Sequence, residues 1–145
     1  MSNALALAGV TAVIKDLLDS GLIDHQVHDK MGVGVTVSAL APDSIQVAND
    51  APPRLNLFLH QVTPNAAWRN SGFPTHNAAG QRVSNAPLAL DLHYLLTAYG
   101  SADLQAEVLL GYAMQLLHET PVLARQALKR SSQVELATGD VCSFK

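Results

Sequence analysis

The chain has 145 residues, of which 48% are hydrophobic and 14% are charged, and its formal net charge is −3. This length fits one domain, residues 1–145, that buries a hydrophobic core without disulfides or a structural metal. The composition excludes a disordered chain and is poor in charge for a free monomer, so we expect some apolar surface to bind partners. Because no basic cluster accompanies the negative charge, we expect no nucleic acid ligand.

The single cysteine and the apolar N-terminus indicate in which cellular compartment the protein is made. Cys142 is the only cysteine, so no disulfide within the chain is possible; we expect synthesis in the cytoplasm and an inert thiol. Residues 1–10 are apolar but lack the basic start of a signal peptide, and Lys15 and Asp16 interrupt them before a membrane-spanning length. We therefore expect neither classical export nor membrane insertion.

The first predicted element is a helix over residues 3–20. Leucine, valine and isoleucine recur there at helical spacing. Ser2 or Asn3 is a suitable N-cap residue, and Gly21 is a typical C-terminal stop.

A polar stretch, a strand and a connection follow this helix. Residues 24–30 are polar. Over residues 33–38 valines alternate with glycine, threonine and serine, which predicts a strand. Residues 39–53 are rich in turn formers and are interpreted as a connection, with a short alternation at 44–47 that would give a minor strand.

Residues 54–62 predict a strand with one buried face and one mixed face. Leucines occupy the buried face. The mixed face carries Arg54, Asn56, Phe58 and His60. Residues 63–87 are polar and contain the lone tryptophan, and ordered loops of this length tend to be functional.

The last third of the chain predicts a strand and two helices. Residues 88–99 fit both a strand and a helix period, and the tyrosines and Thr97 favour the strand. A helix follows up to His118, capped by a polar residue after Gly100, and residues 122–130 predict a second, short helix. This order of elements predicts an α/β (α+β) fold, in which helices pack on a mainly antiparallel or mixed sheet.

Two pairs of histidines are the candidates for chemistry. His25 and His28, three residues apart on a helical turn, would face the same way, but no third metal ligand follows at a telling spacing. His60 and His93 lie on the mixed faces of two strands and would meet across them. We interpret both pairs as structural or exposed residues. The alternative, a histidine-dependent hydrolase or a metal protein, lacks a nucleophile motif and a complete ligand set, so we expect no enzyme, no metal and no cofactor.

The polar loop and the mixed strand face supply the candidate interface residues. Tryptophan and arginine are enriched at interface hot spots, which favours the loop residues Trp68, Arg69 and Asn70. In the alternative interpretation, Trp68 covers the chain's own core and Arg69 is solvated. Arg54 either contacts a partner or pairs with Asp91 on the neighbouring strand, and we favour the pair. The full set of candidates is Arg54, Asn56, Phe58, His60, Trp68, Arg69 and Asn70.

Three stretches of the sequence resemble a known family. They are Arg54-Leu-Asn-Leu-Phe-Leu together with Gln61-Val-Thr-Pro-Asn65 and Trp68-Arg-Asn70, then residues 87–100, then residues 110–123. In order and spacing they are similar to the N-terminal domain of the cap proteins, or tail terminators, of contractile injection systems. The resemblance implies a tail-terminator-like fold and a homohexameric ring without catalysis. The ring would end the inner tube and sheath at the baseplate-distal end, in an intracellular or released phage-tail-like particle made in the cytoplasm.

Two departures from the family pattern limit what the resemblance implies. The chain ends at Lys145 and residues 133–145 show no equivalent of the further strand expected of the family, so the chain is interpreted as possibly lacking the family's C-terminal part. Residues 73–84 match no family feature. The alternative to a cap is a small peptide- or protein-binding adaptor domain that uses an edge strand.

Overall fold

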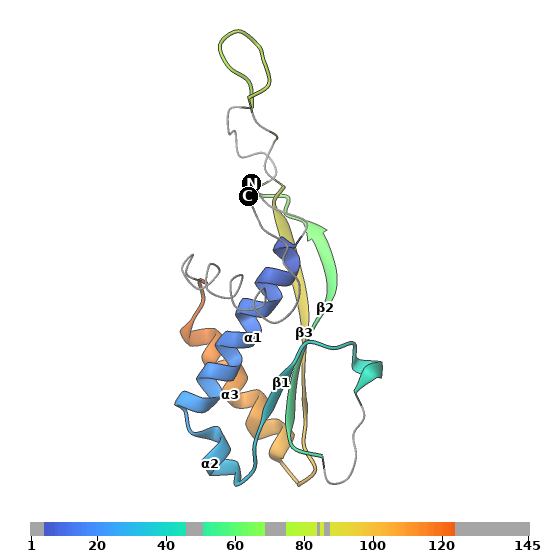
Figure 1. The fold of residues 1–145 in the computed structure, drawn as a ribbon, viewed down its shortest axis with the longest axis vertical. Helices are drawn as coiled ribbons and strands as arrows, with labels where there is room; N and C mark the ends of the chain where they lie inside the picture. The colour runs from blue at the N-terminus through green and yellow to red at the C-terminus, as the bar shows by residue number, and fades with distance from the viewer. Residues whose placement is uncertain (1–4, 46–50, 69–74, 84, 86–87, 124–145) are drawn as a thin grey trace, which may run out of the picture. The chain divides into compact units, whose positions relative to one another are not determined.

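The computed structural model describes residues 5–45, 51–68, 75–83, 85 and 88–123. Their helices and strands are, in chain order, α1 (Ala6–Asp24), α2 (Val27–Met31), β1 (Thr36–Ser38), the 3-10 helix η1 (Pro42–Ser44), β2 (Arg54–Pro64), β3 (Leu90–Tyr99) and α3 (Gln105–Glu119) (Figure 1). None of the helices in the described part of the chain is long and apolar enough to cross a membrane.

The chain divides into two compact units. The helical unit comprises residues 1–58 and 95–145, and the ribbon unit comprises residues 59–94. All three helices and β1 belong to the helical unit, whereas β2 and β3 each contribute residues to both units. The ribbon unit therefore comprises the C-terminal half of β2, the N-terminal half of β3 and the segment that joins the two strands.

The three strands form one mixed sheet in the order β1-β2-β3. β1 runs parallel to β2, with Thr36 opposite Arg54, and residues 39–53 supply the crossover that a parallel pair requires. Thr63 bonds His93 and Asn65 bonds Asp91, so residue numbers rise along β2 as they fall along β3, which makes this pair antiparallel. The predicted α+β class is confirmed, and residues 90–99 are the strand that the tyrosines favoured.

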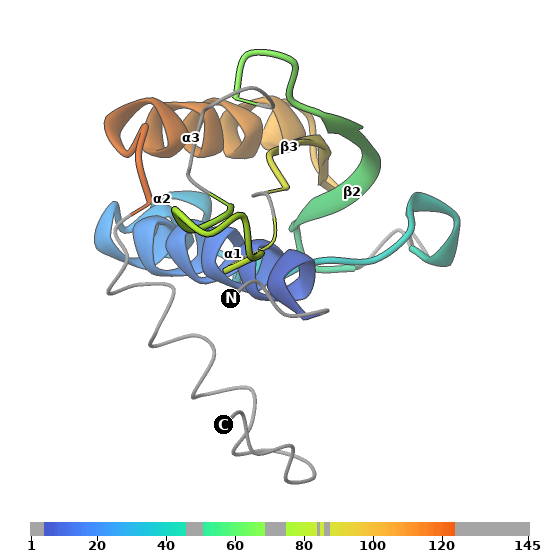
Figure 2. The same ribbon diagram turned by 90° about the horizontal axis from the view of Figure 1, so that it is seen from above.

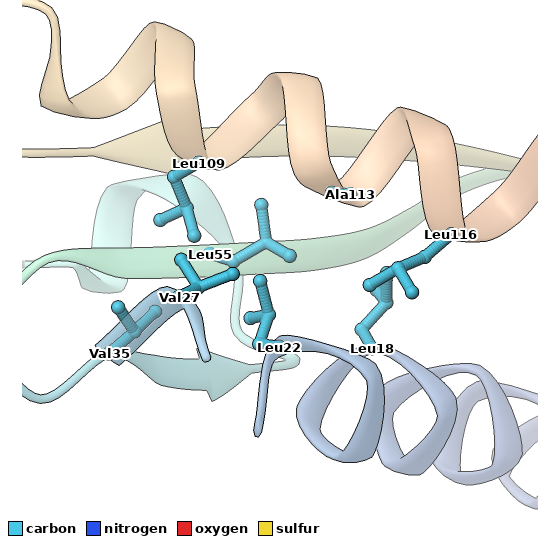
Figure 3. Close-up of a cluster of buried hydrophobic side chains, with 8 residues drawn as sticks. All are labelled: Leu18, Leu22, Val27, Val35, Leu55, Leu109, Ala113 and Leu116. Atoms are coloured by element: carbon cyan, nitrogen blue, oxygen red, sulfur yellow. The ribbon is translucent and has the colours of Figure 1, made fainter. Parts of the chain in front are cut away.

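A cluster of buried aliphatic side chains forms the core of the helical unit (Figure 3). It consists of Leu18, Leu22, Val27, Val35, Leu55, Leu109, Ala113 and Leu116. The residues from α1 and α3 are three or four positions apart, as expected for the buried faces of amphipathic helices. These two helices lie side by side (Figure 2), and each fully buried leucine contributes about 1.5–3 kcal/mol to stability.

α1 extends beyond the predicted stop at Gly21. The helix continues to Asp24, and a Cβ atom placed on Gly21 would lie 2.5 Å from Leu116 Cδ2. The glycine therefore allows α1 and α3 to approach closely and does not end the helix.

Four other segments differ from the prediction. Residues 24–30 contain the short helix α2, which Val27 anchors in the core with no exposed surface. β1 is limited to residues 36–38, and Ser44 belongs to η1, not to a minor strand. Val122 and Leu123 are not helical, and the rest of the predicted helix over 122–130 lies outside the described residues.

Candidate functional site

The ribbon unit has no buried residue among those that the structure describes. Every described residue from 59 to 94 is exposed or half-buried, whereas all residues of the hydrophobic core belong to the helical unit. A two-stranded ribbon is marginally stable by itself and needs a hydrophobic face covered by other structure. The ribbon is therefore the part of the chain most suited to contact another protein.

Side chains alternate along the β3 strand of the ribbon. On β3, Leu90, Leu92 and Tyr94 are half-buried, while Asp91 and His93 between them are exposed. Exposed apolar residues in and beside the strands add to the uncovered surface, among them Leu88, which is 74% exposed. Exposed apolar side chains are a common feature of protein interaction sites.

Polar pairs across β2 and β3 hold the ribbon in register. Thr63 Oγ1 lies 3.0 Å from His93 Nε2, and Asn65 Nδ2 donates a 2.7 Å hydrogen bond to Asp91 Oδ1. The prediction that His60 and His93 meet is confirmed, since their ring centroids are 6.4 Å apart. Both rings are exposed, so they lie at the surface of the ribbon.

Asn65 fixes the turn that presents the lone tryptophan. Its backbone N–H donates to Ala89 O at 3.0 Å, and its Oδ1 accepts the backbone N–H of Trp68 at 2.8 Å. Together with the bond to Asp91, these contacts tie the turn after β2 to the strand beside it. An Asn side chain that bonds backbone N–H groups in this way is a typical turn former.

Trp68 is a surface residue in this structure. It is 64% exposed, so it does not cover the core of the chain, which was the alternative interpretation. A large side chain on a pre-ordered turn loses little conformational entropy when it binds. Its two neighbours in the candidate set, Arg69 and Asn70, lie outside the described residues.

Asn56 is buried and serves the fold. It is 0% exposed; its Oδ1 accepts from Ser38 Oγ at 2.9 Å and from Leu40 N at 3.0 Å, and its Nδ2 donates to Leu40 O at 3.0 Å. These bonds tie β2 to the end of β1 and to the chain that follows. A buried amide with satisfied partners cannot reach another protein, so the prediction of Asn56 as an interface residue does not fit the structure.

The other candidates on β2 differ in exposure. Arg54 and Phe58 are half-buried in the helical unit, and His60 is exposed in the ribbon unit. The predicted pair of Arg54 with Asp91 is wrong, because Asp91 bonds Asn65, just beyond the opposite end of β2. The antiparallel register, which the sequence alone did not define, is the physical reason.

His25 and His28 do not share a helical turn. α1 ends at Asp24, and Gln26 adopts a left-handed conformation with φ of 52° before α2 begins. His25 Nε2 instead lies 3.7 Å from Glu119 Oε2 at the end of α3. Within the described ranges, no group of three or more histidine, cysteine, aspartate or glutamate residues is placed to hold a metal ion.

An ordered turn within the polar loop was missed by sequence reasoning. His76 and Arg82 form an antiparallel bridge, and Asn77 Oδ1 accepts the backbone N–H groups of Ala79 and Gln81 at 3.0 and 2.9 Å. Gly80 takes the left-handed φ of 77° that closes the turn. The signal that could have revealed it is an asparagine three residues before a glycine.

The fold and this surface define a class of protein: an α+β domain that exposes a β-ribbon. The chain belongs to the Pvc16 N-terminal domain family, whose model matches residues 9–141. This membership places it among the proteins of phage-tail-like contractile injection systems, as the sequence resemblance implied at that level. No curated protein and no solved structure gives a significant match.

Proposed function

We propose that the chain is a cap, or tail-terminator, subunit of a contractile injection particle. In this proposal a homohexameric ring of the protein ends the inner tube and sheath at the baseplate-distal end. Family membership supports the kind of particle, and one observation carries the structural role: no described residue of the ribbon unit is buried. If the subunit uses the ribbon unit for assembly, the ribbon surface that is exposed in the single chain would be buried in the ring.

A ring explains how such a subunit ends a stacked tube. Head-to-tail contacts between identical subunits close into a ring when the rotation between neighbours allows it. A closed ring presents the tube with a face that the next tube ring does not match, and polymerisation stops. In this proposal the subunit acts only by contact with other proteins. It needs no catalysis, cofactor or nucleic acid and does not insert into a membrane. The particle acts inside the cell or after release.

Mass in solution tests the proposal directly. We expect light scattering to give about six times the chain mass of 15.4 kDa, either for the protein alone or after addition of its tube and sheath proteins. A protein that stays monomeric at all concentrations and binds neither partner would contradict the cap assignment. Trp68→Ala is the companion variant, because loss of an exposed side chain should weaken assembly without unfolding the chain.

A second candidate function is a peptide-binding adaptor, and the edge of the sheet favours it. β3 has no strand neighbour other than β2 in the described structure. Its sequence contains no proline or lysine, the residues that commonly protect edge strands from pairing. A monomer that binds an extended peptide along β3 and does not assemble would support this function over the cap.

A further inference from the structure

The outward face of α3 carries an apolar stripe on an otherwise soluble helix. Leu104 at the N-cap, Val108 and Met114 are 63%, 45% and 62% exposed. Val108, Gly111 and Met114 follow one another in steps of three residues on the side of the helix away from the buried Leu109 and Ala113, and Leu104 precedes them at the N-cap. The stripe extends for about 15 Å, from ten residues at 1.5 Å each.

A glycine lies in the middle of this outer stripe. Gly111 is exposed, and a Cβ atom placed on it would have no atom within 4 Å. Because the glycine has no side chain, the backbone of α3 is accessible between Val108 and Met114. A flat aromatic ring can lie against such a position, and the methionine sulfur would add a favourable contact with the ring.

The charges of the two units are complementary. α3 carries Glu107 and Glu119 and has no lysine or arginine. Residues 59–94 contain two arginines and one aspartate, whereas the remainder of the chain contains seven basic and eleven acidic residues. The ribbon unit of one copy is therefore attracted to the α3 face of another copy, where opposite charges steer association.

We propose that Trp68 of one copy docks on the outer stripe of α3 of the next copy. The proposal rests on the proposed ring and names its contact: an exposed aromatic residue held by Asn65 meets Leu104, Val108, Gly111 and Met114 of the neighbour. The anchor and the stripe lie on different units of the same chain. The contact is therefore head-to-tail, which is the kind that builds rings.

Complementation between two variants tests this contact. Trp68→Ala removes the anchor but keeps the stripe, and Val108→Glu puts a charge on the stripe but keeps the anchor. We expect each variant alone to need at least about 30-fold more protein for assembly, the factor that corresponds to loss of one interface hot spot. An equimolar mixture can form one intact contact per pair, so we expect heterodimers of twice the chain mass and no ring.

A matched variant and an optical signal serve as controls. Ile23→Glu puts a charge on an exposed aliphatic residue of α1, outside both the ribbon unit and the α3 stripe, so it should assemble as the unmodified chain does. Trp68 is the only tryptophan, and its emission should move to shorter wavelength as the unmodified chain assembles. Circular dichroism checks the fold, and Met114→Glu replaces Val108→Glu if the latter unfolds.

The outcomes separate this inference from the proposed ring. If the unmodified chain forms a ring and both variants assemble as well as the unmodified chain does, the proposed ring is supported but the proposed contact is wrong. If the mixture of the two variants stays monomeric, the anchor and the stripe do not meet, and the contact is again wrong. If the unmodified chain forms no ring with or without its tube and sheath proteins, the proposed function itself fails.

Discussion

Replacement of Asn56 by alanine should strongly destabilise the helical unit. The amide is fully buried and makes hydrogen bonds to Ser38 Oγ and to the backbone N–H and C=O of Leu40, at 2.9, 3.0 and 3.0 Å. Alanine removes all three hydrogen bonds. Since each intramolecular hydrogen bond contributes about 0.5–1.5 kcal/mol net, we expect a loss of about 3 kcal/mol in the free energy of unfolding.

Urea unfolding followed by circular dichroism measures this loss. Gln61→Ala is the matched control, because Gln61 lies on the same strand with an exposed side chain, and it should change stability by less than about 0.5 kcal/mol. A loss below about 1 kcal/mol for Asn56→Ala would refute the reasoning, since it would mean that water or a rearranged backbone satisfies the Leu40 groups.

Other substitutions test the turn and the helix contact. Asn65→Ala should make Trp68 more mobile and lower its fluorescence anisotropy in the monomer, because the acceptor for the Trp68 N–H is lost. Asn77→Ala removes the asparagine of the other ordered turn and should leave the anisotropy unchanged; equal values for both variants would contradict the role of Asn65. Gly9→Ala should stabilise α1 by up to about 1 kcal/mol, because nothing lies within 4 Å of the added atom. Gly21→Val should destabilise the chain by about 1–3 kcal/mol through overpacking against Leu116. Thermal unfolding measures both glycine variants, and stability changes of the same sign for the two would contradict the explanation by local space.

Much of the fold could be predicted from the sequence because its long elements have clear periods. The spacing of apolar residues predicted α1 and α3, and alternation predicted β2 and β3. The short elements could not be predicted in this way. α2 is five residues long and polar except for Val27 and Met31, and tertiary burial of Val27, not local periodicity, accounts for its place in the core.

The candidate site was predicted in part. The choice of Trp68 followed from its residue type and its place in a polar loop, and the meeting of His60 with His93 followed from strand alternation; both are local properties of the sequence. The roles of Asn56 and Asn65 could not be predicted, because an asparagine on a mixed strand face or in a turn has the same sequence signal whether it is buried or exposed. What distinguishes them is the position of other segments: Leu40 next to Asn56, and Ala89 next to Asn65.

The brevity of β1 has a consequence for how this sheet exchanges its amide protons. β1 pairs only with Arg54, Leu55 and Asn56, whereas β2 continues to Pro64. Every second backbone N–H of an antiparallel strand points away from its partner, so from Leu57 onward we expect fast and slow hydrogen exchange to alternate along β2. A strand added by another protein on that side would slow the fast set alone, giving a period-two footprint that a side-chain contact cannot produce.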